Sequence, residues 1–151
     1  MPAFRFRFER LLRMKSIREE EWKQEFARAS HALREAEARR DAAAQRLMER
    51  EAELRRVRAE ERLPLERMLL LHTYVGRLRQ ELEELQREVD AASARVEEVR
   101  ASLAEAMKER KVLEKLKERH RLAYLEELAR IEQRELDEVA RNVTAKPREA
   151  L

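Results

Sequence analysis

Apolar residues recur along most of the chain at alternating spacings of four and three, which is the pattern of a coiled-coil seam. The first seam passes through Trp22, Phe26, Ala29, Leu33, Ala36, Arg40, Ala43, Leu47, Arg50, Leu54 and Val57. Followed backward, it reaches Leu12 and Phe8 and crosses two charged positions, Lys15 and Glu19. The spacing predicts one long helix over about residues 8–61.

A second seam with the same spacing begins just after Pro64. It passes through Met68, Leu71, Val75, Leu78, Leu82, Leu85, Val89, Ala92, Val96, Val99, Leu103, Ala106, Arg110 and Leu113. Because proline is tolerated only before a helix or in its first turn, Pro64 separates two helices. We expect a turn at about 62–64, a second helix over about 65–142 and a frayed tail at 143–151. Gly76 lies inside the second helix, at a cost of about 1 kcal/mol relative to alanine.

Two long helices joined by a short break fold back on each other as an antiparallel hairpin. The predicted fold is therefore all-α, a single domain formed by a long two-helix antiparallel coiled-coil hairpin. The turn pairs residues whose numbers add to about 126, so Phe8 lies opposite about Glu118 and the second helix overhangs the first by roughly 20 residues. Beyond Leu113 two apolar stripes compete, one through Tyr124 and one through Leu125, which is typical of a helix with more than one neighbour.

Aromatic and basic residues alternate strictly from Phe4 to Phe8. Alone, this period of two would suggest a short strand. The sequence offers no partner strand, so we expect an extended lead-in or the first turn of the helix.

The composition agrees with long helices, because one glycine and three prolines cannot supply the turns of a globular domain. There are 35 basic and 32 acidic residues, a net charge of +3, and the two signs interleave along most of the chain. We interpret them as solvated helix faces, not as a basic patch, and expect no nucleic-acid partner.

Nothing in the sequence predicts catalysis or a bound cofactor. A single glycine excludes a glycine-rich phosphate loop, there is no cysteine, and the three histidines lie far apart. We therefore expect no enzyme activity, no cofactor and no metal site. The longest apolar run, Met68–Leu71, is too short to cross a membrane, so we expect no direct membrane insertion.

What remains are surfaces. At the hairpin tip, Leu65, Leu69, Leu70 and Tyr74 lie off the seam, where they either cap the coiled coil or bind a partner. At the other end, the aromatic residues 4–8 and the apolar residues of the overhang, Tyr124, Leu125, Leu128 and Ile131, need cover from self-association or from a partner.

Two segments resemble the FliJ family of flagellar type III export proteins. Residues 4–12, with alternating aromatic and basic residues before Leu11-Leu12, are similar to the start of that family. Residues 109–119, Tyr124 and residues 132–140, with Leu136-Asp137-Glu138 before Val139 and Ala140, are similar to its C-terminal signature.

The resemblance implies a stalk similar to the central stalk of rotary ATPases, cytoplasmic and peripheral at the inner membrane. It implies three partners: the hexameric flagellar export ATPase, the cytoplasmic domain of the membrane export gate, and export chaperones. The residues implied for ATPase binding are Arg110, Glu114, Lys117, Tyr124, Leu128 and Asp137. Those implied for gate binding are Leu70, Tyr74 and Leu78, while Glu81 and Leu85 depart from the family's small and basic residues. The alternatives are an injectisome-type secretion stalk and a generic coiled-coil scaffold.

Overall fold

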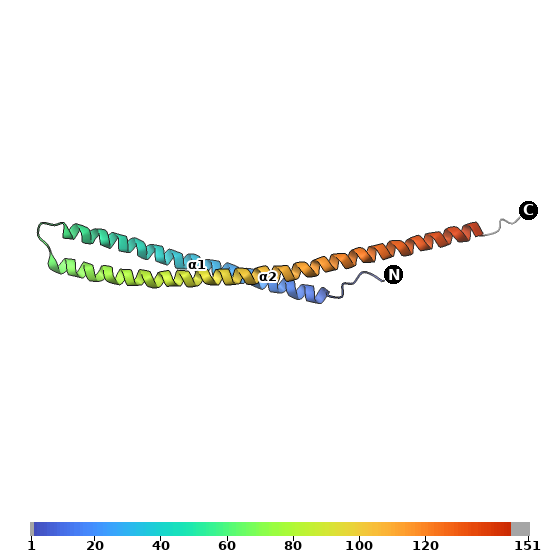
Figure 1. Ribbon diagram of the computed structural model, residues 1–151, viewed down its shortest axis with the longest axis horizontal. Helices are drawn as coiled ribbons and strands as arrows, with labels where there is room; N and C mark the ends of the chain where they lie inside the picture. The colour runs from blue at the N-terminus through green and yellow to red at the C-terminus, as the bar shows by residue number, and fades with distance from the viewer. Residues whose placement is uncertain (1, 146–151) are drawn as a thin grey trace, which may run out of the picture. The chain divides into compact units, whose positions relative to one another are not determined.

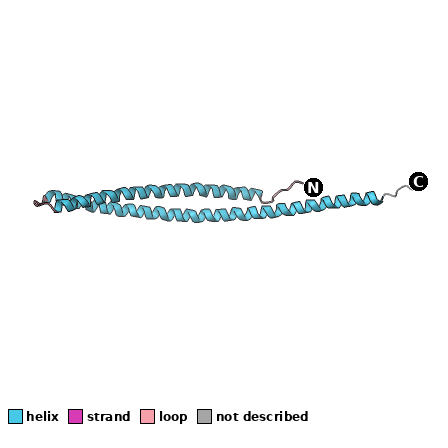
Figure 2. Cartoon of the chain, turned by 90° about the horizontal axis from the view of Figure 1, so that it is seen from above, coloured by secondary structure: helices cyan, strands magenta, loops and turns pink. Residues whose placement is uncertain are grey.

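The computed structural model describes residues 2–145, and all regular structure in that range is helical. Helix α1 spans Glu9–Arg58 and helix α2 spans Leu65–Ala145, joined by a short loop (Figures 1 and 2). The two helices pack against each other, which confirms the predicted all-α hairpin. α1 ends three residues before the predicted 61. Residues 143–145, predicted to fray, continue α2, and 146–151 lie outside the described residues.

The chain divides into two compact units, each containing part of α1 against part of α2. The turn unit is Glu20–Glu105, and the terminal unit is Met1–Glu19 with Ala106–Leu151. That the chain forms a single domain stays a prediction.

In the turn unit, the predicted seam forms the core. Every buried residue here lies at a predicted seam position: Ala29, Ala36, Ala43, Leu54, Val57, Val75, Leu78, Val89, Val96 and Val99. Ala29, Ala36 and Ala43 recur every seven residues, so α1 presents small side chains on which larger ones can pack. Ala29 forms a cluster with Val96 and Val99, flanked by partly buried Trp22, Phe26 and Leu33.

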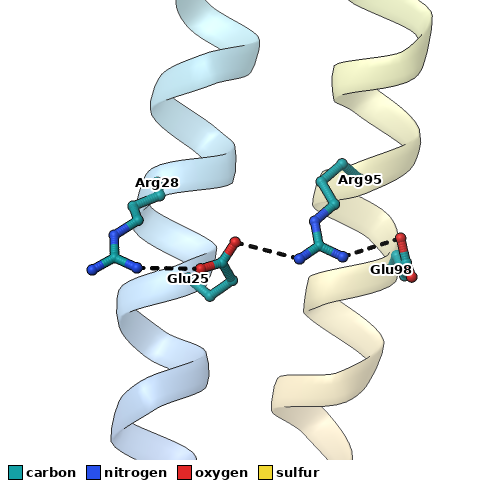
Figure 3. A network of polar contacts seen from close by, with 4 residues as sticks. All are labelled: Glu25, Arg28, Arg95 and Glu98. Carbon is teal, nitrogen blue, oxygen red and sulfur yellow. Dashed lines mark hydrogen bonds and ion pairs between the residues drawn. The ribbon is translucent and has the colours of Figure 1, made fainter.

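Ion pairs between the helices confirm the predicted antiparallel register. Arg95 of α2 reaches Glu25 of α1 at 3.3 Å and Glu98 on its own helix at 3.3 Å, while Arg28 also contacts Glu25 (Figure 3). Further pairs join Arg46 to Glu81, Arg79 to Glu51 and Arg67 to Glu53. Exposed ion pairs of this kind contribute little to stability, so most of the stability comes from the seam.

The residues at the end of α1 and just before α2 are types that stabilise helix ends. Arg55, Arg56 and Arg58 occupy the last turn of α1, where positive charge interacts favourably with the helix dipole. The carbonyl of Pro64 accepts the first α2 hydrogen bond from Met68 N at 2.9 Å. Proline fits at this position because it precedes the helix and no helical N–H is lost.

Replacing Gly76 by alanine should stabilise the turn unit by about 0.5–1 kcal/mol, because alanine is the better helix former. Gly76 has no positive φ, and an added Cβ would meet no atom within 4 Å. The measurement is urea unfolding followed by far-UV circular dichroism. An unchanged or lower urea midpoint would mean that Gly76 contributes to the structure in a way that alanine cannot replace.

Candidate interaction surfaces

Large exposed apolar side chains fall into two sets. One set lies around the turn: Met48, Leu63, Leu65, Leu69, Leu70 and Tyr74. The other lies in the terminal unit: Leu11, Met14, Ile17, Val112, Leu122, Leu125, Leu136, Val139 and Val143. Among the described residues, neither 18–47 nor 75–111 contributes one. Because contiguous exposed apolar surface marks binding sites, these two sets are the candidate interaction surfaces.

The tip surface is formed by Leu63, Leu65, Leu69, Leu70 and Tyr74. Leu70 is 73% exposed and Tyr74 is 43% exposed. The guanidinium of Arg50 lies 6.0 Å from the centre of the Tyr74 ring, within cation–π range. A shallow hollow of about 310 Å³ is lined by Arg50, Glu53, Arg67, Leu70, Leu71 and Tyr74.

Charge pairs fix the polar side of this hollow. Glu53 accepts hydrogen bonds from Arg50 at 2.7 Å and from Arg67 at 3.3 Å. The bond from Arg50, then that from Arg67, lowers the pKa of Glu53 below its ordinary value. A lowered carboxyl pKa means that these bonds favour the folded state at neutral pH and lose that effect as pH falls through the folded-state pKa.

The three residues predicted to bind the export gate do not share one surface. Leu70 and Tyr74 line the hollow together. Leu78 lies in the seam and is only 3% exposed, so in this structure it cannot touch a partner directly. Its role in gate binding stays a prediction.

In the terminal unit, the alternating segment is a non-helical lead-in to α1 that contacts α2 and ends in a turn at residues 7–8. Phe6 is buried and Phe4 and Phe8 are partly buried, whereas Arg5 and Arg7 are exposed. The alternation therefore separates covered phenylalanines from exposed arginines, and the element that Phe4 and Phe6 contact is helix α2 and not a strand.

Ring contacts hold this segment. Phe6 lies edge-on to His120 with 5.6 Å between ring centres, and Phe4 lies 5.6 Å from Tyr124. The Tyr124 hydroxyl donates a hydrogen bond to the Pro2 carbonyl at 2.9 Å. The segment thus covers Tyr124, whereas Leu125 is 42% exposed.

A polar layer interrupts the seam of the terminal unit. Glu19, 3% exposed, accepts a hydrogen bond from Arg110, which also bonds Glu114 at 2.6 Å. Hydrogen bonds to Glu19, then to Glu114, raise the pKa of Arg110. Lys15 pairs with Glu109 at 2.8 Å.

The residues predicted to bind the ATPase are only partly gathered on one surface. Arg110 and Glu114 belong to the polar layer, and Lys117 pairs with Glu9 at 2.8 Å. Leu128 is partly buried, and exposed Asp137 accepts a hydrogen bond from Gln133. The structure thus gives Arg110 and Lys117 intramolecular partners, and contact with an ATPase stays a prediction.

The two signs of charge, which interleave along most of the chain, are unequal in part of the terminal unit. Residues 2–19 and 106–121 hold 13 basic and 5 acidic side chains, a net charge of +8. Folding places these two basic segments, which lie far apart in the sequence, side by side in one unit. The order of charged residues in the sequence indicates this combined basic excess only once the two segments are placed opposite each other.

Within residues 2–145, no group of three or more acidic, histidine or cysteine side chains is arranged to hold a metal ion. In the same range, no helix is long and apolar enough to cross a membrane. What the described structure presents is a pair of surfaces carried by helices.

Fold and surfaces together define a helical hairpin protein whose exposed apolar side chains are concentrated near the turn and in the terminal unit. A family model, flagellar FliJ protein, matches residues 4–149. The chain belongs to the FliJ family and is a component of the flagellar export apparatus. This is an export-associated family, not one of known enzymes. Searches among curated proteins and among solved structures gave no match.

Proposed function

We propose that this chain is the non-enzymatic stalk of the flagellar export apparatus. In this role it binds the centre of the export ATPase hexamer, promotes assembly of the hexamer and couples it to the cytoplasmic domain of the membrane export gate. It acts in the cytoplasm at the inner membrane and also meets export chaperones.

One observation supports the ATPase contact above all. Pro2 meets Tyr124, and α2 continues beyond this point to Ala145. Along that extension Leu125, Leu136, Val139 and Val143 are between 42% and 69% exposed. A helix that presents apolar side chains not covered by any other described residue is suited to insertion into another protein.

For the gate contact, the support is the tip surface. Leu70 and Tyr74 are exposed beside Arg50, so an aliphatic and an aromatic side chain are available next to positive charge. Aromatic residues and arginine are enriched among the residues that dominate binding energy.

Two variants test the two proposed contacts, and each variant is the control for the other. An overhang variant carries Leu125→Ser, Leu136→Ser and Val139→Ser, and a tip variant carries Leu70→Ser and Tyr74→Ser. Binding to the export ATPase and to the gate domain is measured by pull-down and by titration. We expect the overhang variant to bind the ATPase at least about ten-fold more weakly while gate binding is kept, and the tip variant to show the reverse.

Because all five side chains are at least 42% exposed, both variants should fold. If neither variant changed either binding reaction, the assignment of the two surfaces would be wrong. A chain that self-associates and has no affinity for the ATPase would instead favour the generic scaffold.

A further inference from the structure

The basic residues of the terminal unit outnumber the acids available to pair with them. All five acids of residues 2–19 and 106–121 are in ion pairs: Glu9 with Lys117, Glu109 with Lys15, Glu19 and Glu114 with Arg110, and Glu118 with Arg121. Eight exposed cations then have no acidic partner among the described residues, namely Arg5, Arg7, Arg10, Arg13, Lys108, Lys111, Lys115 and Arg119. We call these eight residues the basic collar.

The collar residues of α2 lie on one face of the helix. Their spacings of three, four and four residues from Lys108 to Arg119 keep them within one stripe at about 100° per residue. The seam of α2 in this region passes through buried Ala106 and partly buried Arg110. By the same angular count, the stripe lies on the opposite side of α2 from the seam.

The collar residues of α1 lie on the outer face of that helix too. Arg10 and Arg13 share a face with Ile17, on the far side of α1 from buried Leu12 and Glu19. Because the seams of the two helices face each other, the two stripes point in opposite directions. The positive charge therefore lies on both outer sides of the helix pair.

Exposed apolar side chains accompany the cations on both sides. On the α1 side Met14 and Ile17 are each 59% exposed, and on the α2 side Val112 is 65% and Leu122 48% exposed. A flat partner, such as a membrane surface, or a single nucleic-acid duplex could cover one of these sides and would leave the other in water. A partner that surrounds the pair can cover both.

We propose that the basic collar is the part of the terminal unit that an enclosing partner grips, through a channel whose wall carries carboxylates on opposite sides of the helix pair. The inference rests on the proposed function, in which the export ATPase ring is the enclosing partner. Complementary charge on two opposite sides would centre the helix pair in the channel and speed its entry.

The charge on α2 changes sign just beyond the collar, which would set how deeply the chain enters. Residues 122–145 hold six acidic and three basic side chains, a net charge of −3. A carboxylate wall attracts the collar and repels this segment. The carboxylates therefore belong at the level of the collar, not further along α2.

The test neutralises one side at a time. The α1 variant is Arg10→Gln with Arg13→Gln, the α2 variant is Lys111→Gln with Lys115→Gln, and a third chain carries all four changes. The matched control is Arg34→Gln with Arg77→Gln, two exposed arginines of the turn unit for which no ion pair is seen. Affinity for the purified export ATPase hexamer is measured at low and high salt.

At low salt we expect each two-residue variant to bind about five-fold more weakly and the four-residue variant about twenty-five-fold more weakly, with no change for the control. At high salt the differences should shrink, because screening weakens exposed charge pairs.

An effect confined to one side, or no effect on either side, would overturn the two-sided grip on the basic collar, and in both cases ATPase binding and the proposed function would stand. A random-sequence DNA duplex bound as tightly as the hexamer would also overturn it, in favour of a nonspecific polyanion site. Absence of wild-type binding to the hexamer at low salt would remove the proposed function and the inference together.

Discussion

Arg110→Leu should destabilise the terminal unit more than substitution at any exposed position. Glu19 is 3% exposed, and Arg110 is the cation that the structure places against it. Removing Arg110 takes away the cation that bonds a carboxylate held away from water, which is more unfavourable than the loss of a surface pair. We expect the midpoint of thermal unfolding to fall by roughly 5–10 °C.

The double variant Glu19→Leu with Arg110→Leu should recover this loss and reach or exceed the wild-type midpoint. Both positions belong to seams that are otherwise mostly apolar, and a well-packed apolar pair often replaces a buried ion pair without loss. Glu114→Leu is the control, because the Glu114 side chain is half exposed and should change the midpoint little. A double variant as unstable as Arg110→Leu alone would show that the polar layer stabilises through packing that leucine cannot reproduce.

The ion pair between Glu19 and Arg110 shows how much of the structure the sequence can predict. Glu19 and Arg110 each interrupt a predicted seam, and the predicted register puts them about one helical turn apart. Two charged interruptions that meet across an antiparallel pair are an ion-pair candidate. The positions of the two charged interruptions at the predicted register are therefore enough to predict this ion pair.

Other features could not be predicted, for physical reasons. The alternation at residues 4–8 indicates an extended segment with one apolar face, but it does not say which surface that face covers. The basic collar depends on the pairing of distant segments and on which acids are already used in ion pairs. For Leu78 the sequence made two predictions, a position in the seam and a contact with the export gate. Its burial agrees with the position in the seam.

Phe6→Ala should release the N-terminal segment from α2. Phe6 is the most buried residue of that segment, 7% exposed, and its ring meets His120 at 5.6 Å and Phe8 at 5.8 Å. Truncation of a buried phenylalanine removes about 3 kcal/mol or more of packing energy. This loss falls on a short extended segment, so we expect local release while the two helices stay folded.

Trypsin measures this release directly, because Arg5 and Arg7 lie within the segment and cleavage requires an extended, accessible backbone. The rate of cleavage after these two residues, followed by mass spectrometry, should rise about ten-fold or more in Phe6→Ala. Met14→Ala, at a 59% exposed position of the same unit, should leave the rate unchanged. If cleavage were equally fast in the wild type and in Phe6→Ala, the ring contacts would not hold the segment in solution. Tyr124 would then be open to a partner without any rearrangement.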